Sequence, residues 1–344
     1  MDELLQIRNL NVGFLVKKKP INIINQLNLD IYKDEILAVI GETGCGKSVT
    51  GSAILHLLPE NAIVSGSIMY KGQETLHMKD SEFRELRGNE IMCVPQSPST
   101  SLDPLMRVGK QVSECTLGKK HNRTDAKAVV KSKVTDIFGK LKLPRGASIY
   151  DDFPCELSGG MCQRVLISMG ILTHPDLLVI DEPTKAIDWA LRKDVLEILS
   201  ELRQEMNCAM MLITHDIPLA NRLADRVAVM YAGEIVEIGK TADVLEHPIH
   251  PYTQGLIAST PSKGFKVMKG FMPAFSDLPD GCRFKDRCPY ACESCGQGTT
   301  ELKEAENNHM VRCNRQIGQT EEGSVKYVGS YQLMQELRVG VLAK

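Results

Sequence analysis

The 344-residue sequence contains no apolar run that approaches the roughly 18 residues needed to span a bilayer. Its first residues lack the basic stretch and apolar core of a secretion signal, so we expect a chain that is neither exported nor membrane-spanning. It also lacks a net basic charge, because 41 lysines and arginines face 43 aspartates and glutamates. The resulting formal charge of −2 attracts neither nucleic acid nor anionic lipid, so we expect no nucleic-acid partner.

Cysteine is abundant, with 11 residues, and 5 of these gather near the end of the chain. These five are Cys282, Cys288, Cys292, Cys295 and Cys313. Without a secretion signal we expect the cytoplasm, where thiols stay reduced. Clustered cysteines there favour metal binding over disulfide formation.

The apolar pattern predicts an α/β fold with a mostly parallel sheet flanked by helices. Alternating apolar residues over 5–31 indicate an antiparallel β edge, whereas continuous apolar runs indicate strands that are buried on both faces. These runs are Ile36–Ile40, Leu177–Ile180 and Ala209–Ile213, and helical sequence follows each of them.

Two further segments complete the predicted organisation. Charged helical sequence without a strong strand predicts a helical insertion over about 102–160. After Pro261 the pattern breaks into glycine, proline and cysteine. We therefore predict one large α/β domain over 1–260 and a small Cys-rich C-terminal domain over 261–344, with the cysteine cluster at 282–313.

A phosphate-binding loop lies between the first buried strand and a helix. It fits the pattern G-x-x-x-x-G-K-[ST] and comprises Gly41, Glu42, Thr43, Gly44, Cys45, Gly46, Lys47 and Ser48, with Val49 directly after it. Glycines let successive N–H groups face the phosphates, Lys47 reaches the terminal phosphates, and Ser48 offers a hydroxyl to Mg²⁺. A chance match is the alternative, and the flanking strand and helix argue against it.

Two carboxylates, Asp181 and Glu182, end the second buried strand, at the edge where ligands of open α/β sheets bind. We expect Asp181 to hold Mg²⁺ and Glu182 to polarise a water aimed at the γ-phosphate. A solvated acidic helix start is the alternative.

A second candidate anion site comprises Ser158, Gly159 and Gly160, which precede a helical run. Two glycines after a serine leave N–H groups and a hydroxyl uncovered at the helix start. On its own, this pattern is more typical of a plain helix cap and turn.

Taken together, four segments resemble the ATP-binding subunits of ABC transporters. In chain order they are the loop at 41–48, Leu157–Gly160, the strand end at Leu177–Glu182, and Ile213–Asp216. The resemblance implies a P-loop NTPase fold of ABC type, with ATP and Mg²⁺ bound by a head-to-tail dimer. In that dimer Ser158 and Gly160 of one subunit contact the γ-phosphate of ATP held by the other.

The same resemblance implies roles for single residues. Gln96 would touch Mg²⁺, His215 would act as a switch in catalysis, and Asp188 would belong to the D-loop at the dimer interface. Phe14 matches the position that stacks on adenine, although a place in the core fits an alternating strand equally well.

The segments 224–233 and 250–253 and the C-terminal cysteines resemble the dipeptide, oligopeptide and nickel importer branch of this family. This branch implies a heterodimer with a second homologous ATPase, two transmembrane permease subunits and an extracytoplasmic substrate-binding protein. We therefore predict an ATP-hydrolysing subunit, peripheral at the cytoplasmic face of the cell membrane, that powers uptake of di- or oligopeptides or nickel. A soluble ABC ATPase acting on nucleic acid or ribosomes is the alternative, and a non-hydrolysing sensor is disfavoured by Glu182.

In some members of the branch four cysteines bind a 4Fe-4S cluster, which implies Cys282, Cys288, Cys295 and Cys313 as ligands here. Four thiolates also suit zinc, although compact C-x2-C pairs are missing from these four, and unliganded thiols are a third reading. Cys292 departs from the branch and could replace Cys295. Further departures are Pro95, Ser97, Cys162, Lys185 and Ile187, none of which removes a catalytic atom.

Overall fold

The computed structural model describes residues 2–116, 125–185, 189–205 and 207–314, and the short strand pair 318–319 and 325–326. Its strands are β1 (Glu3–Val16), β2 (Lys19–Tyr32), β3 (Ile36–Ile40), β4 (Ala62–Tyr70), β5 (Gln73–Glu74), β6 (Ile91–Val94), β7 (Leu177–Asp181), β8 (Ala209–Thr214), β9 (Arg226–Tyr231), β10 (Glu234–Lys240), β11 (Lys303–Glu306), β12 (His309–Val311), β13 (Gly318–Gln319) and β14 (Val325–Lys326). Its α-helices are α1 (Lys47–Ile54), α2 (Asp80–Leu86), α3 (Pro98–Ser101), α4 (Val108–Glu114), α5 (Asp125–Lys140), α6 (Gly159–Ile171), α7 (Trp189–Glu205), α8 (Ile217–Leu223), α9 (Thr241–Glu246) and α10 (Pro251–Ala258). Short 3₁₀ helices are η1 (Gly146–Asp151), η2 (Pro154–Glu156), η3 (Pro261–Lys263), η4 (Lys285–Arg287) and η5 (Glu293–Gly296).

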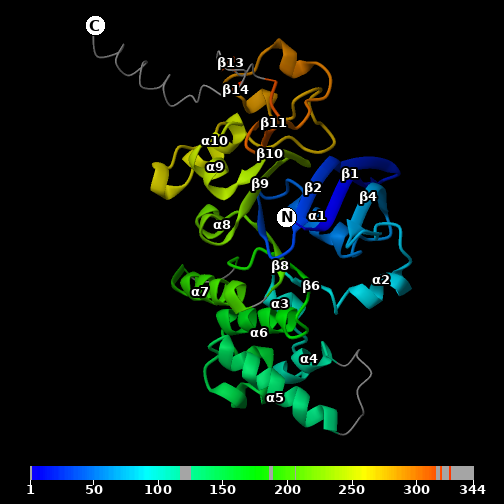
Figure 1. Ribbon diagram of the computed structural model, residues 1–344, viewed down its shortest axis with the longest axis vertical. Coiled ribbons are helices and arrows are strands. Elements are labelled where there is room, and N and C mark those ends of the chain that lie inside the picture. Colours follow the sequence, from blue (N-terminus) through cyan, green and yellow to red (C-terminus); the bar gives the residue numbers. More distant parts are fainter. Residues whose placement is uncertain are drawn as a thin grey trace.

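An eight-stranded sheet forms the centre of the molecule, in the order β11-β12-β10-β9-β3-β8-β7-β6 (Figure 1). The pairs from β9 to β6 are parallel, and the remaining pairs are antiparallel. Every residue of β3 and β8 is buried, as expected for strands covered on both faces. The three predicted buried strands therefore lie in one sheet, with β3 between β9 and β8.

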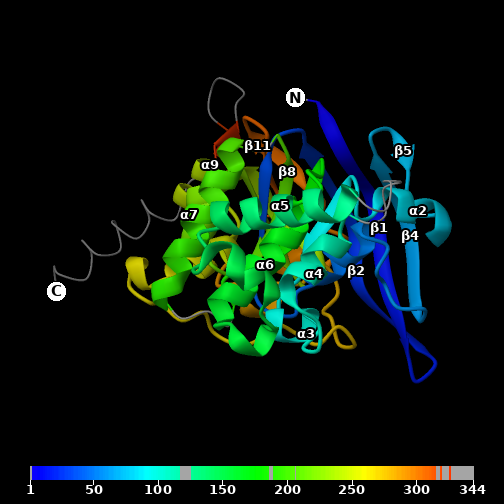
Figure 2. The same cartoon turned by 90° about the horizontal axis from the view of Figure 1, so that it is seen from below.

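The predicted antiparallel edge is a separate sheet in the order β2-β1-β4-β5. Its two long strands pair in a register that places Leu5 opposite Ile31. Figure 2 shows these strands on one side of the molecule and helices α4 to α7 on the other. Side chains of β1 and β2 share a core with β3, β7 and β8, so this sheet packs onto the main one.

The helical insertion comprises α4, α5 and η1 and lies beside α6 (Figure 1). Val112, Phe138 and Ile149 contribute fully buried side chains from these three elements. They pack into the same core as β7, β8 and α6, so the insertion is joined to the ATPase fold by apolar contacts.

The prediction of a separate Cys-rich C-terminal domain is not supported. Strand β12 pairs with β10, which makes β11 and β12 the outer strands of the main sheet. Phe284 is buried in the main core beside Tyr231 and Tyr252. The residues after 260 are thus tied to the ATPase fold through both hydrogen bonds and apolar packing.

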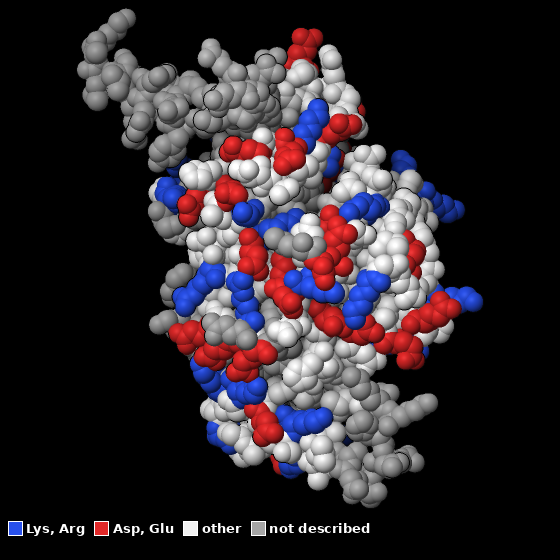
Figure 3. Space-filling model, in the orientation of Figure 1, with Lys and Arg blue, Asp and Glu red and all other residues white. Residues whose placement is uncertain are grey.

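Acidic and basic side chains are interspersed on the face of the molecule shown in Figure 3. This distribution matches the near balance of 41 basic and 43 acidic residues. Among the described helices, none has the length and apolar content to cross a membrane.

Candidate functional site

The loop between β3 and α1 has a backbone that only glycine accommodates at two points. Gly41 has φ +156°, and a Cβ there would lie 2.2 Å from the carbonyl oxygen of Met230. Gly46 has φ +113°, and a Cβ there would lie 2.8 Å from Cδ1 of Ile24. The two glycines therefore allow the loop to curl tightly against β2 and β9 before α1 begins at Lys47.

Lys47 is 5% exposed, and its ammonium group lies inside this loop. Its Nζ donates to the carbonyl oxygens of Gly41 at 2.8 Å and Glu42 at 3.0 Å. These bonds satisfy a buried cation and hold it inside the loop. Phosphate oxygens offer the same ammonium a stronger, charged acceptor.

Asp181 ends β7 beside the loop and is suited to hold a cation. Its Oδ1 is buried and has no hydrogen-bond partner in the described part of the chain. Burial raises the pKa of Asp181, the charge of Glu182 raises it further, and a hydrogen bond from Ser48 opposes both. A carboxylate with an orphaned oxygen next to a serine hydroxyl is the oxygen donor set that Mg²⁺ takes in phosphate sites.

Glu182 and His215 form a paired unit at the same edge of the sheet. His215 Nδ1 lies 2.5 Å from Oε2 of Glu182, whose side chain is only 7% exposed. Burial would raise the pKa of Glu182, but the hydrogen bond and charge of His215 and the charge of Lys47 together lower it. Glu182 is therefore a carboxylate at neutral pH, able to accept a proton from a water molecule.

Gln96 reaches the same edge through sheet topology. Val94 of β6 is in parallel register with Ile180 of β7. Gln96 comes two residues after Val94, as Glu182 comes two residues after Ile180, so the two residues lie at the same edge of the sheet. Asp188 and its side chain lie outside the described residues. Phe14 is half-buried on β1 and packs against the core shared by the two sheets.

The Ser158 segment forms the start of α6 as the pattern predicts. The hydroxyl of Ser158 accepts a hydrogen bond from the backbone N–H of Met161 at 3.3 Å, which caps the helix. Ser158 and Gly159 are exposed, whereas Gly160 is buried. The helix start is therefore exposed, and N–H groups of its first turn have no acceptor within the helix.

Sequence reasoning missed one part of this site, which comes from α10 and from the C-terminal segment, the residues after 260. The guanidinium of Arg287 makes two bonds to the Glu42 carboxylate, Nη2 to Oε1 at 2.9 Å and Nη1 to Oε2 at 3.0 Å. The hydroxyl of Tyr252 accepts from the N–H of Glu42 at 2.9 Å. No sequence signal joins residues more than 200 positions apart, so the sequence alone does not indicate these contacts.

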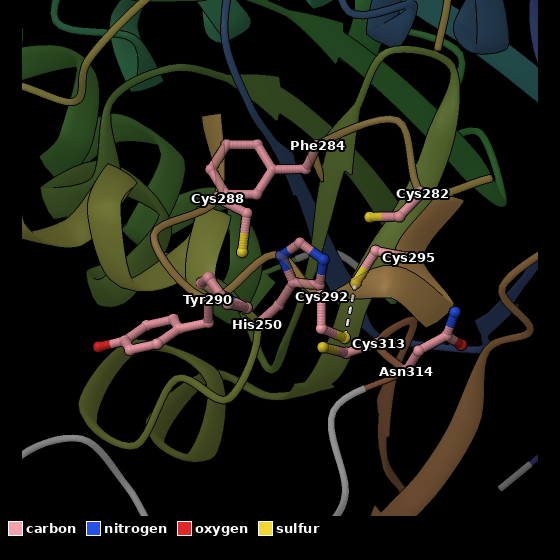
Figure 4. Close-up of a pocket in the computed structure, with 10 residues that line it drawn as sticks. His250, Cys282, Phe284, Cys288, Tyr290, Cys292, Cys295, Cys313 and Asn314 are labelled. Atoms are coloured by element: carbon pink, nitrogen blue, oxygen red, sulfur yellow. Dashed lines mark hydrogen bonds between the residues drawn. The ribbon is translucent and has the colours of Figure 1, made fainter. Parts of the chain in front are cut away.

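The five C-terminal cysteines line one pocket together with His250, Phe284, Tyr290 and Asn314 (Figure 4). The sulfur atoms of Cys292 and Cys295 are 3.6 Å apart, and the dashed line in Figure 4 marks this contact. Burial raises the pKa of Cys282 to about 11, and the nearby Cys295, Cys313 and Cys288 add to the increase. The chemistry of this donor set fits a soft metal or cluster, but in the described structure no three His, Cys, Asp or Glu side chains are close enough to hold a metal ion.

Comparison with known proteins decides the family. Residues 24–185 match the ABC transporter family, and residues 236–295 match the family described as "Oligopeptide/dipeptide transporter, C-terminal region". The oligopeptide transport ATP-binding protein AppD of Bacillus subtilis strain 168 is 35% identical over 91% of this chain and 97% of its own. The chain belongs to the ATP-binding subunits of oligopeptide/dipeptide ABC transporters.

Other relatives agree with this assignment. The oligopeptide transport ATP-binding protein OppD of Escherichia coli K12 is 38% identical over 86% of this chain and 88% of its own. The dimeric ATP-binding cassette MJ0796, solved with ADP and Pi, shares the fold with a TM-score of 0.62 at 22% identity, over 69% of this chain and 99% of its own. As a member of the family, this ABC subunit is an ATPase coupled to transport, and it lies peripherally at the cytoplasmic face of the membrane.

Proposed function

We propose that this subunit powers the import of short peptides, with ATP bound on the loop at 41–48 and hydrolysed at the carboxyl edge of β7. The observation that carries the proposal is the meeting of three groups at one edge of the sheet. These groups are the glycine-curled loop with its buried Lys47, the orphaned Asp181 oxygen, and the ionised Glu182 held by His215.

Each group has a defined task in the proposal. Loop N–H groups and Lys47 bind the phosphates, while Ser48 and Asp181 hold Mg²⁺, which when bound neutralises charge on the β- and γ-phosphates. Glu182 accepts the proton of the attacking water, and His215 positions its carboxylate. Gln96 follows β6 at the same edge, where it would lie near Mg²⁺ and sense the permease.

Closure of a head-to-tail dimer would couple this chemistry to transport. The cap of α6 at Ser158 is exposed, and its N–H groups suit a γ-phosphate held by a second ATPase. ATP would then gain contacts only in the closed dimer, and a ligand shifts an equilibrium by its differential affinity. Moving a mostly open population to a mostly closed one takes about 5.5 kcal/mol, which charged hydrogen bonds at two sites can supply.

Peptides are the cargo that the comparisons favour. The relatives AppD, OppD and DppD are named for oligopeptide or dipeptide transport, and nickel receives no such support. We propose a heterodimer with a second ATPase, two permease subunits and a substrate-binding protein, as the resemblance to peptide importers implies. A soluble role on nucleic acid or ribosomes is not favoured.

The test is ATP hydrolysis by the assembled transporter in proteoliposomes with its own binding protein. We expect short peptides to stimulate hydrolysis several-fold and Ni²⁺ to leave it at the basal rate. Stimulation by Ni²⁺ alone would reassign the cargo, and stimulation by nucleic acid in the absence of permeases would overturn the transport proposal.

We keep the 4Fe-4S cluster on Cys282, Cys288, Cys295 and Cys313 as a proposal supported by donor chemistry alone. The four thiols face one pocket, but the positions of their side chains and the comparisons give no support. Anaerobically purified chain should contain iron and acid-labile sulfide. If the chain contains zinc instead, the cysteines form a zinc site with Cys292 as a candidate ligand. If it contains neither iron nor zinc, the thiols are unliganded.

A further inference from the structure

Every polar group of Glu42, the second residue of the phosphate-binding loop, is hydrogen-bonded to another residue. Its N–H donates to the Tyr252 hydroxyl at 2.9 Å, and its carbonyl oxygen accepts from Lys47 at 3.0 Å. Its carboxylate accepts both arms of the Arg287 guanidinium. A loop residue with its N–H, carbonyl and side chain all fixed has little freedom, so the start of the loop is ordered before any phosphate arrives.

Arg287 is itself fixed on every side. Its side chain is 7% exposed, its Nε donates to the Lys269 carbonyl at 3.1 Å, and its Nη1 lies 3.4 Å from the Tyr231 hydroxyl. The guanidinium also lies 5.6 Å from the Tyr231 ring centre and 5.7 Å from that of Phe284. A rigid fork pre-oriented in this way loses little freedom when it pairs with a carboxylate.

The same arginine is joined directly to the cysteine pocket. It ends η4, and the next residue, Cys288, lines the pocket together with Phe284. Met272, from the same C-terminal segment, lies over the loop, with its Cε 3.7 Å from the point where a Cβ on Gly44 would stand. The C-terminal segment therefore reaches the loop through more than one side chain.

We propose that Arg287 is a positioning residue for nucleotide binding, through which the Cys-rich C-terminal segment holds the phosphate-binding loop in its binding-competent shape. Arg287 acts through Glu42 and touches no nucleotide. When the fork is lost, the loop samples other shapes, and apparent ATP affinity falls in proportion to the ordered fraction. If about one molecule in ten keeps the ordered loop, the Kd for ATP rises about tenfold.

The experiment is a double-mutant cycle on the full-length chain, with the Kd for ATP and Mg²⁺ measured by calorimetry. Arg287→Lys keeps the charge but loses the fork, and Glu42→Gln removes the partner's negative charge and one of its two accepting oxygens from the less buried side. We expect each single variant to raise the Kd about tenfold and the double variant to be no worse than either single one. In the reconstituted transporter carrying Arg287→Lys, the KM for ATP should rise while kcat at saturating ATP stays within about twofold of wild type.

Arg226→Lys is the matched control. Arg226 bonds the largely buried Glu35 with Nη1 at 3.0 Å and 3.3 Å from the two carboxylate oxygens, at the opposite end of β3 from the loop. The Arg226→Lys variant should lower the midpoint of thermal unfolding, as Arg287→Lys does, and leave the Kd for ATP unchanged. If Arg287→Lys unfolds, Glu42→Gln still carries the test.

Two results would overturn the proposal. One is a wild-type Kd in both single variants, and the other is a double variant whose effect equals the product of the two single effects. A wild-type chain that binds no ATP would overturn the ATPase assignment itself and this proposal with it.

Discussion

Replacement of Glu182 by glutamine should separate ATP binding from ATP hydrolysis. The side chain is 7% exposed and hydrogen-bonded to His215, and glutamine keeps its shape and an oxygen for that bond. What glutamine loses is the carboxylate, which is ionised at neutral pH because His215 and Lys47 outweigh its burial and lower its pKa. Loss of a general base costs a factor of 10² to 10⁴, or about 3 to 5 kcal/mol of the barrier.

Single-turnover hydrolysis by the assembled transporter, with the Kd for ATP measured in parallel, is the assay. We expect the Glu182→Gln rate constant to fall at least 100-fold while the Kd stays within about threefold of wild type. Glu74→Gln is the control, because Glu74 is also hydrogen-bonded but is only half-buried and lies in the antiparallel sheet. A Glu182→Gln rate within a few-fold of wild type would exclude Glu182 as the base.

Three other perturbations test the geometry. Glu182 accepts the hydrogen bond of His215 and raises the pKa of His215 above its ordinary 6.5, while His215 overcomes burial to lower that of Glu182 below 4.5. The pair therefore makes its full contribution to the free energy of unfolding between pH 4.5 and 6.5. This contribution declines as the pH rises through the raised pKa of His215 or falls through the lowered pKa of Glu182. His215→Ala should accordingly lower the free energy of unfolding, measured in urea, more at about pH 5.5 than at about pH 9. Equal decreases at the two pH values would refute the pairing. Gly41→Ala should raise the Kd for ATP more than tenfold, because its Cβ would stand 2.2 Å from the Met230 carbonyl oxygen, and unchanged binding would show a different loop. Gly139→Ala, on α5 where an added Cβ meets nothing within 4 Å, should raise the free energy of unfolding by up to about 1 kcal/mol, and a loss would mean that the helix needs glycine there.

The central strands and the phosphate-binding loop were predictable because their signals are local. Strands β3, β7 and β8 are continuous apolar runs, and the loop motif has fixed spacing between a strand and a helix. The carboxylates at the end of β7 could be placed because parallel strands end at one edge of a sheet. These parts of the fold and site needed no knowledge of long-range contacts.

The parts that escaped prediction depend on contacts between distant residues. Nothing in β12 indicates that it pairs with β10, so the C-terminal segment looked like a domain of its own. The bond between Arg287 and Glu42 spans 245 positions and follows from packing around Tyr231 and Phe284. The sequence predicts Cys282, Cys288, Cys295 and Cys313 as one ligand set, and all four line one pocket. Spacing along the chain does not give the distances between their sulfur atoms, and no three metal-binding side chains of the described residues are close enough to hold an ion.

The central claim is that the Ser158 turn of one ATPase subunit completes the ATP-binding site of its neighbour. A cryo-EM map of the transporter carrying Glu182→Gln, with ATP and Mg²⁺, tests it most directly. We predict that the Ser158 hydroxyl and the Gly160 N–H of this chain contact the γ-phosphate bound on the partner's loop. A closed assembly in which that turn faces away from every phosphate would contradict the account.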